Sequence, residues 1–400
     1  MSRGDPSGEE FVLLGIPDVN GSIRGKALRP DAFEAAVEHG TVMTDLILGL
    51  DPVDTPIADY ERFGIRTGAA DLIVHPEVDT LRDLAWRPGW RVCLATPSWP
   101  DGSPCDFATR EVLRRVLADV AELGYEVLSA IEYEIRLWDA QEQPTSRAVH
   151  TEAGPGLLEL NLGAARGLAA ADHAALLKFG VKRLAASLGL RASFLAKTAP
   201  GEEGSSGHVH LSCWQGATNA FAGEGREAPL PPVFTSAIAG VLDHLPAASL
   251  LLNPTINSYK RLVPGWFAPI NATWGYENRS CAVRAIRSDR ADLWRFECRR
   301  PGAAATPYLA LAAIGASAAD GIRNGAGPPE PLVGDAYAAA LPELPSSLES
   351  ALHAFESDDI LREALGKDFG DYYATSRRWE LKAWRETVTG WERARYDRSV

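Results

Sequence analysis

Four short segments of this chain carry ionisable side chains at every second residue, with apolar side chains between them. Alternate residues of a β-strand point to the same face, so this spacing predicts strands with one charged and one apolar face. The charged positions are Glu132 and Glu134, then Glu159 with Glu152 before it across a Gly-Pro-Gly turn, then His208, His210 and Ser212, and finally Arg295, Glu297 and Arg299.

A half-exposed strand with a solvated face would account for any one of these segments alone. Together they favour another interpretation, because their flanks are apolar and an unpaired buried carboxylate is costly. Several carboxylates and an imidazole that converge on one buried face need divalent cations. Such an oxygen-rich set of ligands indicates Mg²⁺ or Mn²⁺ rather than zinc.

A second group of candidate residues is cationic and lies between residues 253 and 299. It consists of arginines set among Pro, Gly and Asn: Arg261, Arg279, Arg284, Arg295 and Arg299. A solvated charged face is the alternative, but arginines beside metal carboxylates favour anionic substrates, since guanidinium groups match phosphate and carboxylate oxygens. Divalent metals with an arginine array indicate phosphoryl transfer. The sequence has no G-x-x-x-x-G-K-[ST] motif, which excludes a P-loop enzyme.

The composition argues against several other classes of protein. Acidic residues outnumber basic ones by 53 to 40, for a formal charge of −13, which argues against a nucleic-acid-binding protein. Apolar stretches fall short of the roughly 20 residues that span a bilayer, and no apolar signal segment opens the chain. The five cysteines are scattered without a C-x-x-C pair, which argues against a disulfide framework and a thiolate zinc site. We therefore expect a soluble cytoplasmic protein.

The organisation of the chain predicts an α+β protein of two domains. Residues 11–28 predict a strand, a turn and a second strand, and the Pro/Gly/Ser-rich stretch 97–104 predicts a boundary between domains 1–100 and 101–400. Beyond the boundary, apolar residues at helical spacing predict helices at about 113–123, 172–188, 307–322 and 372–396, alternating with strands.

These segments, in this order, resemble the glutamine synthetase family over nearly the whole chain. The similar motifs are R-G-K at 24–26, E-Y-E at 132–134, E-A-G-P-G-L-L-E at 152–159, Lys197 with G-S-S-G-H-V-H-L-S at 204–212, N-P-T-I-N-S-Y-K-R-L-V-P-G at 253–265, N-R-S at 278–280 with Arg284, and E-C-R at 297–299. The resemblance implies a small N-terminal β-grasp domain and a larger catalytic domain, in which helices accompany an antiparallel sheet. It also implies a double-ring homo-oligomer, a dodecamer, with active sites between subunits.

The resemblance implies a role for each matching residue. Glu134, Glu152 and Glu159 would hold one metal ion, and Glu132, His208 and Glu297 a second. Arg279 and Arg284 would bind the transferring phosphate and the nucleotide, with His210, Ser212 and Arg295 on the nucleotide side. Arg261 and Arg299 would bind glutamate, with Gly204 nearby. The catalytic residues would be Arg279, Glu297 and Arg299, and the reaction would join ATP and glutamate into an acyl phosphate that an amine attacks.

The chain departs from the family where the amine should bind. Ammonia-using members follow V-P-G with an aromatic residue and then Glu, whereas here Trp266 is followed by Phe267. Phenylalanine cannot hold a cation by charge or accept a proton. Leu157 stands where the family has Gln. In the Gly/Ser-rich segment 201–207, which we expect to form a flexible flap, Glu203 stands where the family has Asn.

We therefore expect an ATP-dependent ligase that forms a γ-glutamyl amide from glutamate and an organic amine, with Trp266 and Phe267 beside the amine. A hydrophobic or small monoamine fits an apolar pocket better than a polyamine does. The alternatives are a γ-glutamylpolyamine synthetase, a glutamine synthetase, and a catalytically inactive regulatory or scaffold oligomer. The complete set of metal ligands favours an enzyme over the last of these.

Overall fold

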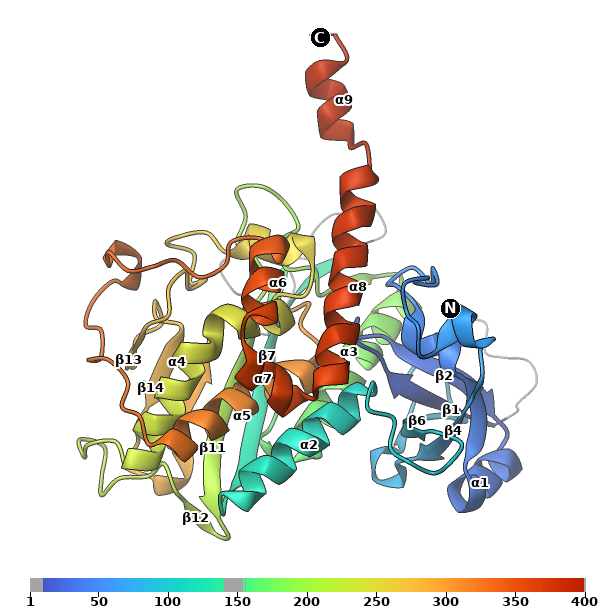
Figure 1. Ribbon diagram of the computed structural model, residues 1–400, viewed down its shortest axis with the longest axis horizontal. Helices are drawn as coiled ribbons and strands as arrows, with labels where there is room; N and C mark the ends of the chain where they lie inside the picture. The colour runs from blue at the N-terminus through green and yellow to red at the C-terminus, as the bar shows by residue number, and fades with distance from the viewer. Residues whose placement is uncertain (1–9, 140–153, 155, 399–400) are drawn as a thin grey trace.

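The computed structural model describes residues 10–139, 154 and 156–398, and contains two mixed β-sheets with helices around them (Figure 1). The N-terminal sheet has the strand order β2-β1-β6-β4-β3, with β5 paired to β6. Its strands are β1 (Phe11–Pro17), β2 (Ile23–Leu28), β3 (Thr41–Thr44), β4 (Asp71–Pro76), β5 (Arg82–Asp83) and β6 (Trp90–Ser98), with helix α1 (Pro30–His39) between β2 and β3.

The larger sheet has the order β10-β7-β11-β15-β14-β13, with β8 and β9 on β7 and β12 on β11. The strands are β7 (Glu126–Trp138), β8 (Leu157–Asn161), β9 (Ala165–Arg166), β10 (Arg191–Ser193), β11 (Gly207–Gln215), β12 (Thr218–Asn219), β13 (Trp274–Tyr276), β14 (Val283–Ile286) and β15 (Arg295–Cys298). Its pairs are antiparallel apart from β13 with β14. The predicted α+β class is confirmed. The domain boundary at residue 100 stays a prediction, and the two sheets fall on either side of it.

The predicted strand-turn-strand of residues 11–28 is confirmed as the antiparallel pair β1 and β2. Asp18 builds the turn, because its Oδ1 accepts hydrogen bonds from the backbone N–H groups of Asn20 at 2.9 Å and Ser22 at 2.7 Å. Its Oδ2 accepts from Arg24 Nε at 2.7 Å. Lys26 Nζ donates to Thr41 Oγ1 and to a backbone carbonyl. The R-G-K segment therefore serves the N-terminal sheet itself.

Helices cover the apolar face of the larger sheet. Helices α2 (Thr109–Glu122), α3 (Leu168–Ser187) and α5 (Pro307–Asn324) contact β7, and all three were predicted. Helix α4 (Pro232–Leu252) packs beside α5, helix α6 (Leu348–Glu356) packs on α4, and helix α7 (Asp359–Leu365) packs on α5 and α2; all three were missed.

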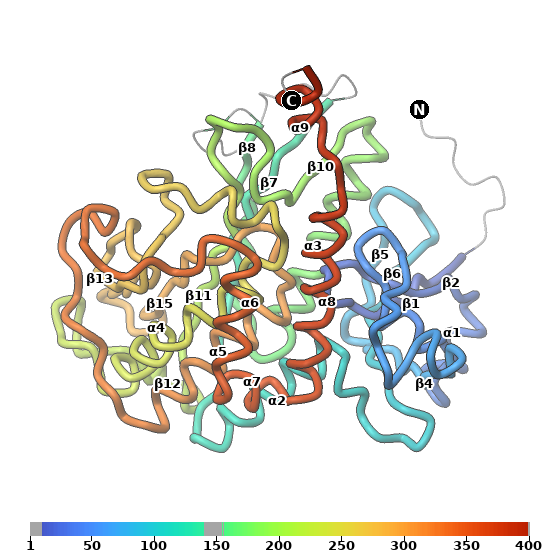
Figure 2. Tube along the Cα trace, turned by 45° about the horizontal axis from the view of Figure 1, so that its top comes forward, coloured from blue at the N-terminus to red at the C-terminus, as the bar shows by residue number. Residues whose placement is uncertain are grey.

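The prediction of one continuous helix near 372–396 is wrong. The chain forms α8 (Lys367–Glu386) and then a separate α9 (Gly390–Tyr396), because Thr389 caps α9 in a reciprocal capping box with Glu392. Figure 2 shows α3 and α8 between the two sheets. Helix α8 joins them through hydrogen bonds from Tyr372 Oη to the Leu48 carbonyl at 2.6 Å and from Arg377 Nη2 to Asn20 Oδ1 at 2.6 Å.

Helix α4 shows why periodicity could not reveal the centre of the core. By length and composition it could cross a membrane, with a mean hydropathy of 1.3 over its most apolar window, yet 83% of that window is buried inside the protein. Asp243 and His244 interrupt its apolar run, so the sequence offers only shorter apolar stretches. A helix that is apolar on all sides has no amphipathic signature.

Glycines allow α4 and α5 to cross at close range. A Cβ built on Gly240 would lie 2.1 Å from the Ser317 carbonyl oxygen, and one on Gly321 would lie 2.0 Å from the Ser236 carbonyl oxygen. Both obstacles are backbone atoms, which cannot move without displacing a helix.

We predict that Gly240→Ala destabilises the protein by about 1–3 kcal/mol or more, the usual cost of overpacking a core. Thermal unfolding monitored by circular dichroism measures the effect. Gly327→Ala is the matched control, because a Cβ there would have nothing within 4 Å. Equal unfolding temperatures for the two variants would contradict the close crossing.

Candidate active site

Strand register brings the predicted charged residues onto one face of the larger sheet. Directly paired residues of neighbouring strands project to the same face. The pairs that matter are Glu132 with His208, Glu134 with Glu159, His210 with Glu297, and Arg284 with Glu297. The residues between them, including Ile131, Val209 and Phe296, are buried on the opposite face. Segments far apart in the sequence therefore form one polar surface.

Two carboxylates and two imidazoles form the centre of this surface. Glu297 Oε1 lies 3.3 Å from His208 Nδ1, and Glu132 Oε1 lies 3.1 Å from His210 Nε2. His208 Nδ1 is also 3.9 Å from Glu132 Oε2. Ligand atoms of Glu132, His210 and Glu297 lie within 4.8 Å of one another. The structure thus brings together the three predicted ligands of one metal and adds His210 as a further candidate.

The protonation states of this cluster suit a cation. Burial opposes ionisation of Glu297, but interactions with the neighbouring His208 imidazole and Arg299 guanidinium outweigh it and lower its pKa to about 2. Burial opposes ionisation of Glu132 as well, but the proximity of the His208 and His210 imidazoles outweighs it and lowers the pKa of Glu132. Burial lowers the pKa of His208, which favours the neutral, ligating form. His208 Nε2 is buried and has no hydrogen-bond partner among the described residues.

Glu134 and Glu159, predicted for the other metal, lie next to each other on β7 and β8. Glu134 Oε2 accepts a hydrogen bond from the Ser206 N–H at 2.7 Å, and Glu159 Oε1 accepts one from Asn161 Nδ2 at 2.9 Å. Glu152, the third ligand predicted here, lies outside the described residues.

A cavity of about 380 Å³ opens over these carboxylates. Its lining residues are Glu132, Glu134, Glu159, Glu203, Gly204, Ser206, His208, Trp266, Phe267, Arg279, Arg284, Glu297 and Arg299. Arg284 pairs with Glu277 and, at 3.1 Å, with Glu297 Oε2, while Arg299 pairs with Glu297. Arg279 is exposed and makes no ion pair in the described part of the chain.

Arg261 differs from the other predicted arginines because it lies behind the cavity wall. It is 2% exposed, and its guanidinium donates to Ser206 Oγ at 2.9 Å and to the Arg299 and Arg300 carbonyls at 3.3 and 3.2 Å. Burial lowers its pKa to about 10. A Cβ on Gly204 would lie 2.5 Å from Arg261 Cγ, so glycine lets the flap lie against this arginine.

The side of the cavity where the sequence predicts the amine is formed by loops. Phe267 is 56% exposed, with a φ of +52° that residues other than glycine rarely adopt. Lys197 Nζ lies 4.0 Å from the centre of the Trp266 ring and donates to the Glu202 carbonyl. The sequence alone assigns no role in the site to Lys197 or Ser206, and it marks Glu203 as a departure from the family that adds a negative charge near the amine side.

An adjoining cavity of about 310 Å³ unites the residues predicted for the nucleotide side. His210, Ser212 and Arg295 line it together with Glu132, which also lines the larger cavity. Arg295 Nε donates to His210 Nδ1 at 3.1 Å. The two cavities therefore meet at Glu132.

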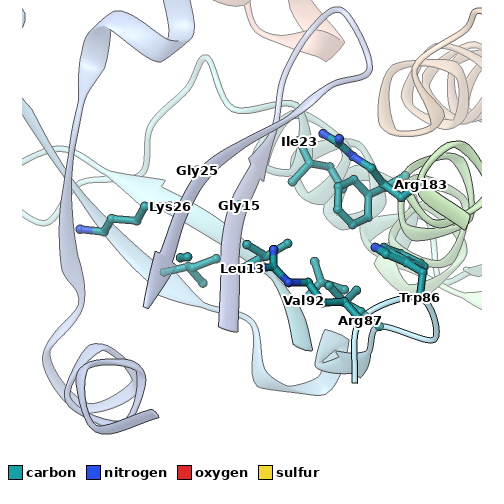
Figure 3. A pocket seen from close by; sticks show the side chains of 13 residues that line it. Leu13, Gly15, Ile23, Gly25, Lys26, Trp86, Arg87, Val92 and Arg183 are labelled. Carbon is teal, nitrogen blue, oxygen red and sulfur yellow. The ribbon is translucent and has the colours of Figure 1, made fainter. Parts of the chain in front are cut away.

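A third cavity, of about 350 Å³, lies between the N-terminal sheet and α3 and contains none of the predicted site residues. Trp86, Arg87 and Arg183 line it, and Lys26 points away from them (Figure 3).

Comparison with known proteins identifies the family. The glutamine synthetase catalytic domain matches residues 144–396. This chain belongs to the glutamine synthetase family. It is 32% identical to γ-glutamylethanolamide synthetase GlnA4 of Streptomyces coelicolor, over 96% of this chain and 91% of the relative. It is 31% identical to a glutamate–isopropylamine ligase of a Pseudomonas species, over 97% and 95%. The solved GmaS–ADP complex superposes with a TM-score of 0.84 at 29% identity, covering 98% of this chain and 97% of that one.

Family membership makes the protein an ATP-dependent carbon–nitrogen ligase, and confirms the predicted fold of a small N-terminal sheet domain and a larger catalytic domain. Glutamine synthetases use ATP and divalent metal ions. The ionised carboxylates, the buried imidazoles and the unpartnered His208 Nε2 fit such a metal.

We predict that Glu297→Ala abolishes ATP turnover and weakens divalent-cation binding while the fold persists. Metal that binds only the folded protein stabilises it by roughly 2.7 kcal/mol at 100 times its dissociation constant. Thermal unfolding with increasing Mn²⁺ should therefore show a shift for the wild type that the variant loses. Glu277→Ala is the control, because Glu277 pairs with Arg284 but does not line the cavity. An undiminished Mn²⁺ shift in Glu297→Ala would refute the assignment.

Proposed function

We propose that this ligase joins the γ-carboxylate of glutamate to an organic amine. The observation that carries the proposal is Phe267, an exposed apolar residue in the cavity wall where ammonia-using relatives carry a carboxylate. Overall similarity cannot decide the acceptor, because γ-glutamyl amide ligases and glutamine synthetases match this chain almost equally well.

The proposed reaction has two steps. An oxygen of the glutamate γ-carboxylate attacks the terminal phosphorus of ATP, which gives γ-glutamyl phosphate and ADP. The amine nitrogen then attacks the carbonyl carbon, and phosphate and a proton leave. Two bound divalent cations, Mg²⁺ or Mn²⁺, would supply positive charge to the phosphate groups. Glu134 and Glu159, with Glu152, would hold one of them, and Glu132, His208 and Glu297 the other.

Three arginines of the cavity have distinct proposed tasks. Arg279 has no ion pair within the described chain, so it is available to the transferring phosphoryl group. Arg284 is anchored by Glu277 and Glu297 and would bind the nucleotide phosphates. Arg299 would bind the glutamate carboxylate through the guanidinium donors that Glu297 leaves available.

Three alternative functions have less support from the cavity than a γ-glutamyl amide ligase has. Glutamine synthesis from ammonia would lack the family's carboxylate at position 267. A polyamine would bring a second cation toward Lys197, which already carries a positive charge beside Trp266. A purely structural oligomer would bury ionised carboxylates without using them, although they are costly.

We further propose a cytoplasmic homo-oligomer, the double-ring dodecamer of the family. Helix α9 extends away from the body of the subunit (Figure 1), and α8 and α9 expose Trp384, Trp391 and Tyr396. Large exposed aromatics are typical of association surfaces. The five cysteines are all free, which suits a reducing compartment.

The overall test is phosphate release with ATP, glutamate, Mg²⁺ and a panel of amines that includes ammonia, alkyl monoamines and a polyamine. We expect the highest kcat/KM with a hydrophobic monoamine, because each buried CH₂ contributes about 0.8 kcal/mol. We expect a polyamine to rank second and ammonia last. Equal or better use of ammonia would contradict the proposal.

We predict that Arg299→Lys raises the KM for glutamate roughly tenfold or more, because lysine keeps the charge and loses the planar fork. Arg261→Lys should instead lower the unfolding temperature, since that guanidinium holds three groups of the protein. Initial rates and thermal unfolding of both variants separate the two roles. An unchanged glutamate KM in Arg299→Lys would point to another acid or another site.

We predict that Phe267→Glu raises the kcat/KM ratio of ammonia over ethylamine by roughly tenfold, the effect of about 1.4 kcal/mol from a restored charge. Phe267→Gln is the control, because it has the same shape as glutamate without the charge. If both variants change the ratio alike, polarity or space rather than charge determines the acceptor.

A further inference from the structure

Two adjacent acidic residues of the flap have different environments. The Glu202 carboxylate lies 3.3 Å from Arg136 Nη1, which ties it to β7. The Glu203 backbone carbonyl accepts from Arg136 Nη2 at 2.8 Å, so the same arginine fixes the position of Glu203. The Glu203 carboxylate makes no hydrogen bond or ion pair within the described residues, and Glu203 lines the cavity beside Trp266 and Phe267.

The other carboxylates of that cavity wall are engaged. Their partners are His210 for Glu132, the Ser206 N–H for Glu134, Asn161 for Glu159, and Arg284 with Arg299 for Glu297. Glu203 is therefore the carboxylate of the described wall that remains available to a ligand.

The Trp266 ring beside it accepts an ammonium group. Lys197 Nζ lies 4.0 Å from the ring centre, a cation–π distance. The Glu203 charge acts on this ammonium and favours its protonated form, although burial and the Arg136 charge prevail and lower the pKa of Lys197. This corner therefore combines an aromatic face, a carboxylate and an apolar neighbour in Phe267.

We propose that Glu203 and the Trp266 ring recognise the acceptor amine in its ammonium form, with Phe267 as the wall for its apolar body. Glu203 then supplies, from the flap, the negative charge that position 267 lacks. The inference rests on the proposed ligase function and narrows the acceptor to a primary amine with one cationic head and a short apolar body. Glu203 can balance the charge of that one head, whereas a second cation would meet the Lys197 charge without a carboxylate to balance it.

Glu203→Gln tests the proposal, because it removes the charge and keeps the shape. Ethylamine is cationic at neutral pH, whereas hydroxylamine is a small amine nucleophile that is uncharged there. Losing a charged hydrogen bond should raise the KM for ethylamine roughly tenfold or more. The KM values for hydroxylamine and for glutamate should stay near those of the wild type. Trp266→Leu, which removes the ring, should show the same selectivity against ethylamine.

Glu202→Gln is the matched control and should leave the ratio of the two amine KM values unchanged. Equal changes for both amines in Glu203→Gln, or no change, overturn the proposal. A rise confined to the KM for glutamate also overturns it, because Glu203 would then contact the donor. If the wild type releases no phosphate with any amine, the ligase proposal and this inference both fail. Wild-type turnover with an unaltered ratio in Glu203→Gln refutes this inference alone.

Discussion

The structure of the site depends on pairing buried carboxylates with positively charged or hydrogen-bonding side chains from neighbouring strands. Glu297 is 1% exposed, and such a carboxylate stays ionised only because His208, Arg284 and Arg299 surround it. His208 and Arg284 come from β11 and β14, and Arg299 directly follows β15, which carries Glu297 itself. A shift of one strand by one residue would therefore move its charged groups to the apolar face. The helices that bury the apolar face hold the strands in this register. A bound cation would balance the same carboxylates.

Arg261 connects the flap to these charged strands. Its guanidinium joins Ser206 to the two carbonyls that directly follow β15, and Ser206 in turn donates its N–H to Glu134. The Glu134 N–H donates back to the Ser206 carbonyl at 2.9 Å. A buried arginine behind the cavity wall thereby holds the Glu134 carboxylate and the flap in one arrangement.

Much of the site could be predicted from the sequence, because a strand's period of two is local information. The segments around Glu132, His210 and Glu297 are strands with the expected faces. The register between strands and the depth at which a side chain is buried depend on residues that are far apart in the sequence. The sequence could not show that His210 joins Glu132 and Glu297, or that Arg261 lies behind Gly204 instead of lining the cavity. Helix α4 was missed because complete burial removes the amphipathic pattern, and the break before α9 was missed because the capping box at Thr389 interrupts a sequence that keeps helical spacing.

The two halves of the cavity differ in how they are built, and this difference bears on specificity. The half of the cavity that carries Glu132, Glu134, Glu159, His208 and Glu297 stands on paired strands, where a change at one residue disturbs partners on neighbouring strands. The other half, with Trp266, Phe267 and Glu203, stands on loops outside the paired strands. Phe267 has a left-handed backbone conformation that costs roughly 1–3 kcal/mol and persists only where the surrounding structure holds it. The loop therefore sets the position of this side chain before any amine binds. Its chemical identity can change without altering the sheet, so the acceptor can vary while phosphoryl transfer is retained.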